Sequence, residues 1–249
     1  ITSARLDACV RGAVDALWLG EPAIAIEAHR VATASRELTA TLVIDARGPD
    51  RVPRARAGWQ TFVGQEVIVP DHGLARPIVM DATVEQRGAF TFMYVLPLSR
   101  DLLLVEDTAF ADHAYLDVSA GRAAIAAYAA DRGWTIERVI REETGVLPLP
   151  LELEAPSPTG SPLVAGYAGG WFHPVTGYSF PVAARLASLI ASLPASELFG
   201  PALAALAASH RTQIAFATRL NRMLFGWFAP ERRYHVLERF YGLPEDIIR

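Results

Sequence analysis

The spacing of apolar positions divides the chain into stretches of different character, and the first runs from residue 1 to residue 48. Residues 3–15 place apolar side chains at helical spacing on one face, which predicts a helix. Strand-like runs follow at 16–19, 23–28 and 42–45. A helix followed by short strands, the last of them ending in Asp45-Ala-Arg-Gly48, is typical of the middle of a dinucleotide-binding domain. We therefore predict that residues 1–48 form part of such a domain.

The second stretch, residues 49–150, consists of strand-like runs separated by glycine, proline and aspartate. Strands are predicted at 61–69, 78–84, 89–96 and 102–107, and one helix at 122–132. We interpret this stretch as a β-rich insertion that forms a cap over a substrate.

The remaining residues are predicted to return to the first domain and then to become helical. Residues 151–196 hold a proline-rich connector, a short strand at 163–168, a glycine-rich turn and a helix at 182–193. Residues 197–249 read as mostly helical, with breaks at Gly226, Pro230 and Gly242. The expected fold class is α/β, or mixed α+β. It combines a partial Rossmann-like domain with a β-rich cap and a helical C-terminal segment.

Composition narrows the class of protein. The chain has 249 residues, of which 51% are apolar, so it can bury a sizeable core. It has no uncharged apolar run of about 18–20 residues, the length that crosses a bilayer, and no secretory signal opens it. Its single cysteine, Cys9, excludes an internal disulfide, and no metal site is predicted. Cys9 is expected to be a small buried residue, and the protein to be cytoplasmic.

Charge is distributed unevenly along the chain. The formal net charge is −4, and all 23 basic residues are arginines. Residues 209–249 hold seven arginines against four acids, whereas the rest of the chain is acidic. A nucleic-acid-binding protein needs a basic domain rather than one basic tail. We therefore expect no nucleic-acid partner.

An acidic pair follows the apolar run Leu102–Val105, which is predicted to be a strand covered on both faces. Burial would raise the pKa of Glu106, and the neighbouring Asp107 would raise it further. A carboxyl group that is neutral near pH 7 can deliver a proton to an alkene, or its ionised form can take one from a carbocation. From the residues alone, a plainer reading is favoured, in which Asp107 and Thr108 form a turn and Glu106 pairs with an arginine.

A glycine-rich turn runs into the helix predicted from residue 182. The turn is Gly169-Gly-Trp-Phe-His-Pro-Val-Thr-Gly-Tyr-Ser-Phe180. Glycines let the backbone approach a flat ligand, and the N-terminus of the following helix presents free N–H groups to an anionic one. By itself, His173 is more typical of a loop histidine with a satisfied hydrogen bond than of a catalyst.

Five separated segments resemble the bacterial lycopene β-cyclases, which are flavoproteins that close the end rings of carotenoids. These segments are 58–66, 75–83, 92–98, 104–108 and the turn at 169–180. Members of that family open with a glycine-rich nucleotide-binding unit, and no Gly-x-Gly-x-x-Gly occurs here. We therefore expect the chain to be an internal part of a longer protein.

The resemblance reverses the preference between the two readings of the acidic pair. It implies that Glu106 takes part directly in catalysis as acid or base, with Asp107 tuning it. It also implies that reduced FAD is the cofactor and that lycopene is converted to γ-carotene and then to β-carotene. The cofactor would be contacted by Asp45, Gly48, Gly169, Gly170, His173, Pro174, Thr176, Gly177 and Tyr178. The polyene would be contacted by Trp59, Phe62, Phe92 and Tyr94.

A membrane-held substrate implies a peripheral membrane protein, and reduced flavin implies NAD(P)H or a reductase as electron donor. Arginines and aromatic residues mix near the C-terminus, which suits either a membrane-docking surface or an ordinary packing helix. They are Arg219, Arg222, Phe225, Trp227, Phe228, Arg232, Arg233 and Tyr234. Two other functions stay open: a related FAD-dependent prenyl reductase or hydroxylase, and a non-catalytic lipid- or carotenoid-binding fragment.

Overall fold

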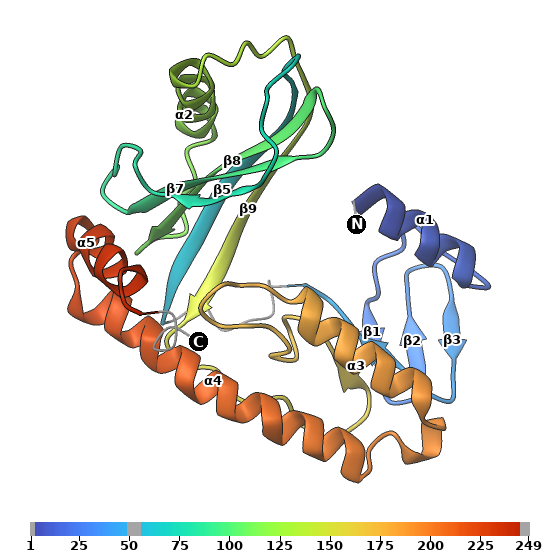
Figure 1. Cartoon of the computed structure of the whole chain (residues 1–249). Helices are drawn as coiled ribbons and strands as arrows, with labels where there is room; N and C mark the ends of the chain where they lie inside the picture. The colour runs from blue at the N-terminus through green and yellow to red at the C-terminus, as the bar shows by residue number, and fades with distance from the viewer. Residues whose placement is uncertain (1–2, 49–55, 245–249) are drawn as a thin grey trace.

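The computed structural model describes residues 3–48 and 56–244 (Figure 1). They form a mixed α/β fold, which confirms the predicted class. Its largest element is a five-stranded antiparallel sheet of order β6-β7-β8-β5-β9. A three-stranded sheet, β1-β2-β3, and a parallel pair, β4 with β10, complete the strands of the described part. The predicted division into four segments stays a prediction.

The N-terminal region is lightly packed. Helix α1 (Ser3–Ala13) is followed by the meander β1 (Ala25–Ile26), β2 (Arg30–Ala32) and β3 (Glu37–Thr39). The strand predicted at 16–19 does not form, since no neighbouring strand pairs with it. The expected burial of Cys9 is also wrong, because α1 lies on the surface and its cysteine is exposed.

A parallel strand pair connects the two ends of the predicted cofactor-binding domain. Strand β4 (Ile44–Asp45) pairs with β10 (Leu163–Val164), and the N–H of Ala165 donates to the carbonyl of Asp45 at 2.7 Å. Carboxyl ends of parallel strands meet at one edge of a sheet. The pairing therefore brings the segment that follows Asp45 next to the start of the glycine-rich turn.

The five-stranded sheet carries the acidic pair. Its strands are β5 (Ala57–Ile68), β6 (Ile78–Asp81), β7 (Phe90–Pro97), β8 (Leu102–Ala111) and β9 (Arg138–Pro150). Four of them match predicted strands, whereas β9 was missed. Strands β5 and β9 extend beyond the others toward the C-terminal helices (Figure 1).

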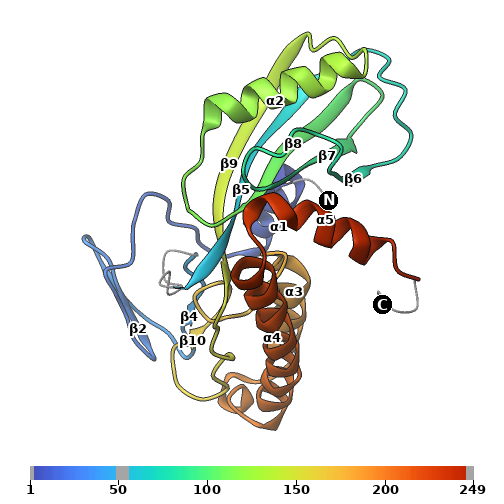
Figure 2. The ribbon, with the colours of Figure 1, turned by 90° about the vertical axis from the view of Figure 1, so that its left-hand side faces the viewer.

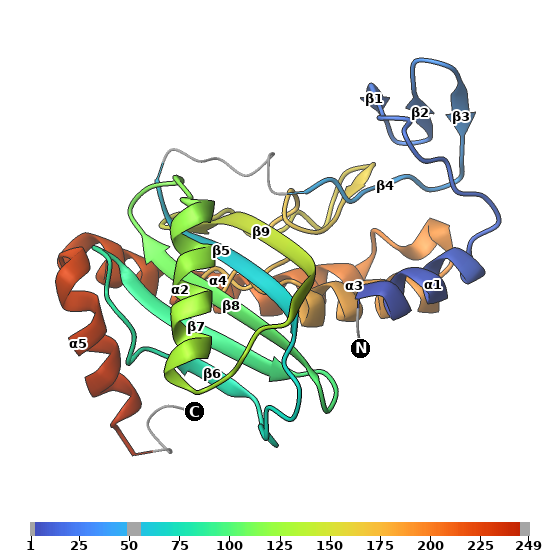
Figure 3. The same cartoon turned by 90° about the horizontal axis from the view of Figure 1, so that it is seen from above.

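Helix α2 (Val118–Asp131) covers one face of this sheet, as Figures 2 and 3 show. It begins four residues earlier than predicted because the Asp117 carboxylate caps it, accepting from the N–H of Ala120 at 2.9 Å. Gly121 permits the close approach, since a Cβ there would stand 2.6 Å from Val63. The buried core of this face is formed by Val63, Val67, Met93, Val95, Leu103, Val105, Ile125 and Tyr128.

The C-terminal helices lie on the other side of the sheet. Helices α3 (Phe180–Ser192), α4 (Pro201–Trp227) and α5 (Pro230–Tyr241) follow one another, with a short 3-10 helix, η2 (Ala195–Glu197), after α3. The predicted break at Gly226 is wrong, since α4 continues through it to Trp227. The amide of Asn221 in α4 donates to the carbonyls of Pro150 and Pro174, which ties the helix to β9 and to the glycine-rich turn.

Candidate active site

Glu106 lies in β8, on the face of the sheet that points away from α2. In the strand register it stands between Gly64 of β5 and Tyr94 of β7. Because Gly64 has no side chain, the sheet surface is indented there, and Oε2 of Glu106 lies 3.5 Å from the point where a Cβ would stand. The predicted acid therefore borders a notch in the sheet.

The surroundings of Glu106 favour its neutral form. Burial raises the pKa of its carboxyl above the ordinary value, and the hydroxyl of Thr108, which donates to Oε1 at 2.7 Å, opposes that rise. The charges of Glu143 and Asp107 add to the rise, because a nearby carboxylate disfavours ionisation. A carboxyl group held neutral in this way can act as a general acid.

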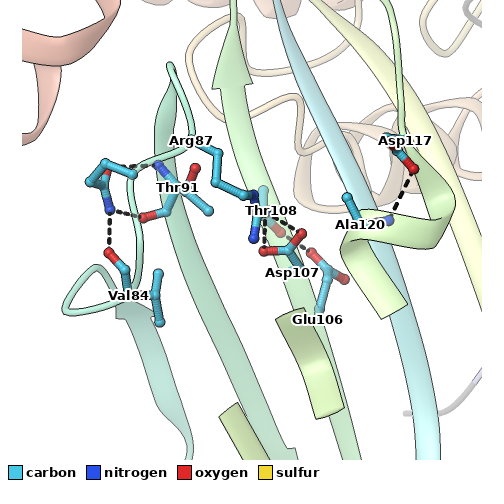
Figure 4. A network of polar contacts seen from close by, with 9 residues as sticks. Val84, Arg87, Thr91, Glu106, Asp107, Thr108, Asp117 and Ala120 are labelled. Carbon is cyan, nitrogen blue, oxygen red and sulfur yellow. Dashed lines mark hydrogen bonds and ion pairs between the residues drawn. The ribbon is translucent and has the colours of Figure 1, made fainter. Parts of the chain in front are cut away.

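Asp107 points to the opposite face, toward α2 (Figure 4). Its two oxygens accept from Nη2 of Arg87 at 2.8 and 2.6 Å, and one of them lies 3.5 Å from the Cβ position of Gly121. Burial raises the pKa of Asp107, and the Arg87 guanidinium opposes that rise. The turn alternative is wrong: the pair lies inside β8, and Asp107 rather than Glu106 pairs with an arginine.

The strand before the acidic pair is covered less evenly than predicted. Leu103 and Val105 are fully buried against the α2 side, whereas Leu102 and Leu104 on the other side are only half-buried. The prediction that this strand is covered on both faces is therefore confirmed on the α2 side only. The Glu106 face keeps partly open positions, which a site for a ligand requires.

Three of the four predicted substrate residues share the face of Glu106. Phe62 of β5 and Phe92 of β7 flank Thr108 in the register, and Tyr94 stands beside the acid itself. The rings of Phe92 and Tyr94 meet edge to face with centroids 5.2 Å apart. Burial first, and then the charge of Glu106, raises the pKa of Tyr94 to about 12. The acid is thus bordered by aromatic rings.

Trp59, the fourth predicted substrate residue, is placed elsewhere. Successive side chains on a strand alternate between faces, so Trp59 lies on the face opposite Phe62. It is buried between Ala111 and Pro148 in the register. Trp59 therefore does not reach the Glu106 side of the sheet.

A cavity of about 580 Å³ lies between α5 and strands β6 and β7. No local sequence pattern predicts this cavity, because its walls come from segments about 150 residues apart. Phe90 forms part of its floor, next to Phe92 in the same aromatic cluster. It is lined mainly by Val79, Met80, Ala82, Tyr234, Leu237 and Tyr241. These side chains make the cavity largely apolar.

The first glycines of the predicted cofactor turn serve the packing of the chain. A Cβ on Gly169 would stand 2.0 Å from the carbonyl oxygen of Val164, so only glycine fits there. Gly170 has φ +75°, and its carbonyl accepts from Nε2 of His210 at 3.0 Å. The ring of His210 stacks on Trp171. These contacts fix the backbone that leads into the second half of the turn.

The second half of the turn, residues 173–178, forms a compact loop. The N–H of Gly177 donates to the carbonyl of His173 at 2.9 Å, and the N–H of His173 donates to that of Tyr178 at 3.0 Å. Gly177 has φ +65°, a conformation that favours glycine. Pro174 is buried, whereas Thr176 and Tyr178 are exposed. The loop thus presents Thr176 and Tyr178 on its outer surface, where a ligand can reach them.

His173 and the start of α3 complete this loop. Burial, and then the nearby His210, lowers the pKa of His173, so the neutral ring is favoured, and its Nδ1 lies 3.3 Å from Oγ1 of Thr176. Ser179, the N-cap of α3, makes no side-chain cap bond, and the first turn holds no acid. The N–H groups of this helix end are therefore available to an anionic group.

An unsatisfied polar atom lies where the loop meets the sheet. Oε1 of Gln60 is buried and has no hydrogen-bond partner among the described residues, and it lies 3.6 Å from the Cβ position of Gly177. Gln60 and Gly64 share one face of β5, four residues or about 13 Å apart. The glycine loop and Glu106 therefore lie on the same side of the sheet.

The other two predicted cofactor residues lie at the end of β4. The carboxylate of Asp45 is buried and accepts from the backbone N–H of Arg47 at 3.2 Å and from its guanidinium at 2.8 and 2.6 Å. Gly48 is exposed, with no atom within 4 Å of its Cβ position. Asp45 thus orders the chain beyond the parallel strand pair.

Comparison with known proteins identifies the family. The family model "Lycopene cyclase protein" matches residues 14–249. The chain belongs to the lycopene cyclase family. It is 37% identical to a lycopene β-cyclase from Paracoccus sp. (strain N81106 / MBIC 01143), with 99% of this chain and 66% of the relative covered. It is 40% identical to that of Pantoea ananas, with 93% of this chain and 62% of the relative covered.

A third lycopene β-cyclase, from Pseudescherichia vulneris, is 40% identical over all of this chain and 66% of the relative. The lycopene cyclase chain thus spans 62–66% of the length of the curated relatives that it matches. The resemblance seen in the sequence is confirmed.

Two solved structures share the fold of this lycopene cyclase family member. A geranylgeranyl bacteriochlorophyll reductase-like protein from Thermoplasma acidophilum matches with a TM-score of 0.55 at 14% identity, covering 98% of this chain and 64% of that one. An anhydrotetracycline hydroxylase from Streptomyces rimosus matches with a TM-score of 0.50 at 19% identity, covering 98% and 54%. At such identities the likeness concerns the fold alone.

The C-terminal residues predicted for membrane docking do not form one surface in this family member. Arg233 is completely buried and bonds to Asp112 at 2.5 Å, and the ring of Phe225 packs on Gly58. These two side chains are unavailable to a membrane, because they join α5 and α4 to the sheet. Trp227, by contrast, is 75% exposed.

Two kinds of feature are absent from the part of the lycopene cyclase chain that the structure describes. Within residues 3–48 and 56–244, no helix is both long enough and apolar enough to span a bilayer. Over the same ranges, no three side chains of histidine, cysteine, aspartate or glutamate converge to hold a metal ion.

Proposed function

We propose that the protein is a lycopene β-cyclase, which converts the acyclic end groups of lycopene into β-rings without net oxidation or reduction. The observation that carries the proposal is the position of Glu106. It is a carboxyl group whose pKa is raised by burial, placed at a notch in the sheet and bordered by the aromatic ring of Tyr94. This combination suits proton delivery to an apolar alkene.

In this mechanism the chain supplies a proton and a surface that tolerates positive charge. The Glu106 hydroxyl adds its proton to the terminal double bond of the end group, which leaves a tertiary carbocation. The electron-rich face of Tyr94, whose ring packs against the buried ring of Phe92, stabilises that cation. The next double bond closes the six-membered ring, and a ring proton then leaves. The same rings keep water away from the cation.

We assign cofactor binding to the glycine loop and the end of β4. Gly177, Thr176, Tyr178 and the free end of α3 would face the flavin, and Oε1 of Gln60 offers an unsatisfied acceptor at the same place. Reduced FAD, when bound, supplies negative charge close to the reacting end group. NAD(P)H or a reductase would keep it reduced. The proposal also includes the other predicted cofactor residues, which act mostly by holding the backbone in place. They are Asp45, Gly48, Gly169, Gly170, His173 and Pro174.

We place the protein on the cytoplasmic side of a membrane, where carotenoids are held. The apolar cavity opens beside Tyr241 at the end of α5, where Phe240, Tyr241 and Leu243 are exposed next to Arg239. Aromatic and apolar groups beside an arginine suit the interface of a bilayer. The end of α5, rather than the whole C-terminal segment, is thus the proposed docking surface.

A second candidate function is a flavin-dependent redox reaction on a prenyl chain. Its support is the fold shared with the reductase-like protein from Thermoplasma acidophilum. Such a reaction does not need a proton donor for ring closure. The two functions therefore differ in what they require of Glu106.

The test uses the complete gene product in lycopene-accumulating cells. Wild type is expected to yield β-carotene, whereas Glu106→Gln, at matched expression, should leave lycopene with at least about a 100-fold loss of rings. Glu137→Gln, a change at an exposed glutamate next to the sheet, is the matched control and should behave as wild type. A well-expressed wild type that forms no rings would reject the cyclase proposal and favour the redox reaction.

A further inference from the structure

A second glutamate faces Glu106 across the notch. Gly64 pairs with Glu106 of β8 on one side and with Glu143 of β9 on the other, so the three positions form one row across the sheet. Residues in one row of a sheet point to the same face. Oε2 of Glu106 and Cγ of Glu143 each lie 3.5 Å from the Cβ position of Gly64, so both side chains converge over the glycine.

The two carboxyl groups differ in their surroundings. Glu106 is covered and bonded to a hydroxyl, whereas the Glu143 carboxylate accepts from Nη2 of Arg141 at 2.8 Å and is 39% exposed. One side of the notch thus holds a buried carboxyl group and the other an arginine-paired carboxylate that water can reach.

Ring formation in the proposed function needs both of these groups. A proton must be added to the end group at the start and another must be removed from the ring at the end. By then Glu106 is ionised, but it lies beside the carbon to which it added its proton and not beside the ring proton that must leave. Glu143 lies on the far side of a ring held over Gly64.

We propose that Glu143 is the catalytic base that removes the ring proton, an inference that rests on the proposed cyclase function. The proton of the Glu106 carboxyl adds to one carbon of the terminal double bond, and the adjacent carbon becomes a cation. The electron pair of the next double bond forms the ring C–C bond and moves the cation into the ring. The Glu143 carboxylate then takes a proton from the adjacent ring carbon, and the released C–H pair becomes the ring double bond.

The cycle closes without an oxidant or a reductant. After the reaction Glu143 carries a proton and Glu106 is ionised, which is the reverse of the starting state. Both side chains lie over Gly64, so a proton can return from Glu143 to Glu106 directly or through one water molecule. The same proximity explains why the charge of Glu143 raises the pKa of Glu106.

The test is the position of the ring double bond, because a purely electrostatic role would not alter it. In Glu143→Gln the second cation lacks its base and must lose a proton from another ring carbon or capture water. We expect β-rings to fall at least about tenfold, with isomeric rings or ring alcohols rising in share. Glu143→Asp, which retains the carboxylate one methylene shorter, should restore part of the β-ring yield.

Glu142→Gln is the matched control, since Glu142 is the neighbouring residue on the opposite face and bonds to Gln65 and Arg122. It should give wild-type products. The complete protein is used throughout, with folding checked by circular dichroism and melting temperature. If Glu143→Gln does not fold, the product ratio of Glu143→Ala, which also lacks the carboxylate, decides.

Failure of the proposed role of Glu143 can be distinguished from failure of the cyclase function. A folded Glu143→Gln variant that makes only β-rings, within about twofold of the wild-type rate, would overturn the role of Glu143. Unchanged product ratios in Glu143→Ala would do so where Glu143→Gln cannot be obtained. A wild-type protein that forms no rings would overturn the cyclase function itself, so the two failures are distinguishable.

Discussion

Glu106 and Asp107 are adjacent in the sequence, yet their carboxyl groups lie on opposite faces of β8. Glu106 faces the aromatic side and accepts from Thr108, whereas Asp107 faces α2 and pairs with Arg87. The alternation of side chains on a strand produces this separation. It gives the two acids different surroundings, with the proposed proton donor on the aromatic face and an ion pair to Arg87 on the other.

The first prediction concerns the stability of Glu106→Gln at different pH values. The folded-state pKa of Glu106 lies above its unfolded value, so the folded protein retains this proton more readily. The stability that the protonated Glu106 carboxyl contributes is fully present below its pKa in the unfolded state. It is lost as pH rises through its pKa in the folded state. The melting temperature of the variant, relative to wild type, should therefore be higher at pH 8 than at pH 4. A difference that does not change with pH would contradict the burial of this carboxyl.

The second prediction concerns Asp107→Asn. The change removes a buried ion pair with Arg87, and we expect the free energy of unfolding to fall by about 1–3 kcal/mol. Denaturant titration measures it. Protein that remains folded should still form β-rings, since Asp107 does not face the reacting side. Loss of ring formation in a fully folded variant would show that Asp107 acts on the chemistry.

The third prediction concerns Gly177→Ala in the glycine loop. Gly177 has φ +65°, and a Cβ there would stand 3.0 Å from the hydroxyl oxygen of Tyr167. We expect a loss of about 1–2 kcal/mol of stability and a weaker hold on flavin, measured by flavin absorbance after gel filtration. Gly133→Ala is the matched control, because it has φ +68° but open space around it. Equal flavin retention in the two variants would reject the loop as a cofactor site.

The fourth prediction concerns docking by the end of α5. Replacing both Phe240 and Tyr241 by serine should reduce co-sedimentation with vesicles of phosphatidylcholine and phosphatidylglycerol several-fold, because it removes exposed aromatic groups. Ile24→Ser, at an exposed apolar position beside β1, should have no effect. If both proteins bind vesicles as wild type does, membrane contact lies elsewhere.

The sequence predicted the strands that carry the acid but not which way their side chains point. Strands β7 and β8 have strong apolar runs and appear close to where they were expected, whereas β9 was missed because Arg141, Glu142 and Glu143 interrupt its apolar pattern. In the sheet Arg141 and Glu142 pair with side chains of β5 and α2. Partners so distant in the sequence cannot be read from a local pattern.

Only part of the candidate site could be predicted, because its residues also come from segments that are distant in the sequence. Phe62, Phe92 and Tyr94 share the face of Glu106, whereas Trp59 lies on the other face, and a face can be assigned only once the register of β5 is known. Glu143 and the cavity under α5 depend on contacts between remote segments. They became visible only through the sheet order and the path of the C-terminal helix.

The most direct test of proton delivery by Glu106 is ring formation by the purified, flavin-reduced complete protein in deuterated buffer. Wild type is predicted to place one deuterium in each new ring, at the carbon that receives the proton. Glu106→Gln, with equal flavin content, should form at least about 100-fold fewer rings. Ring formation by Glu106→Gln within about tenfold of the wild-type rate, with the same deuterium content, would show that another group delivers the proton and would contradict the proposed role of Glu106.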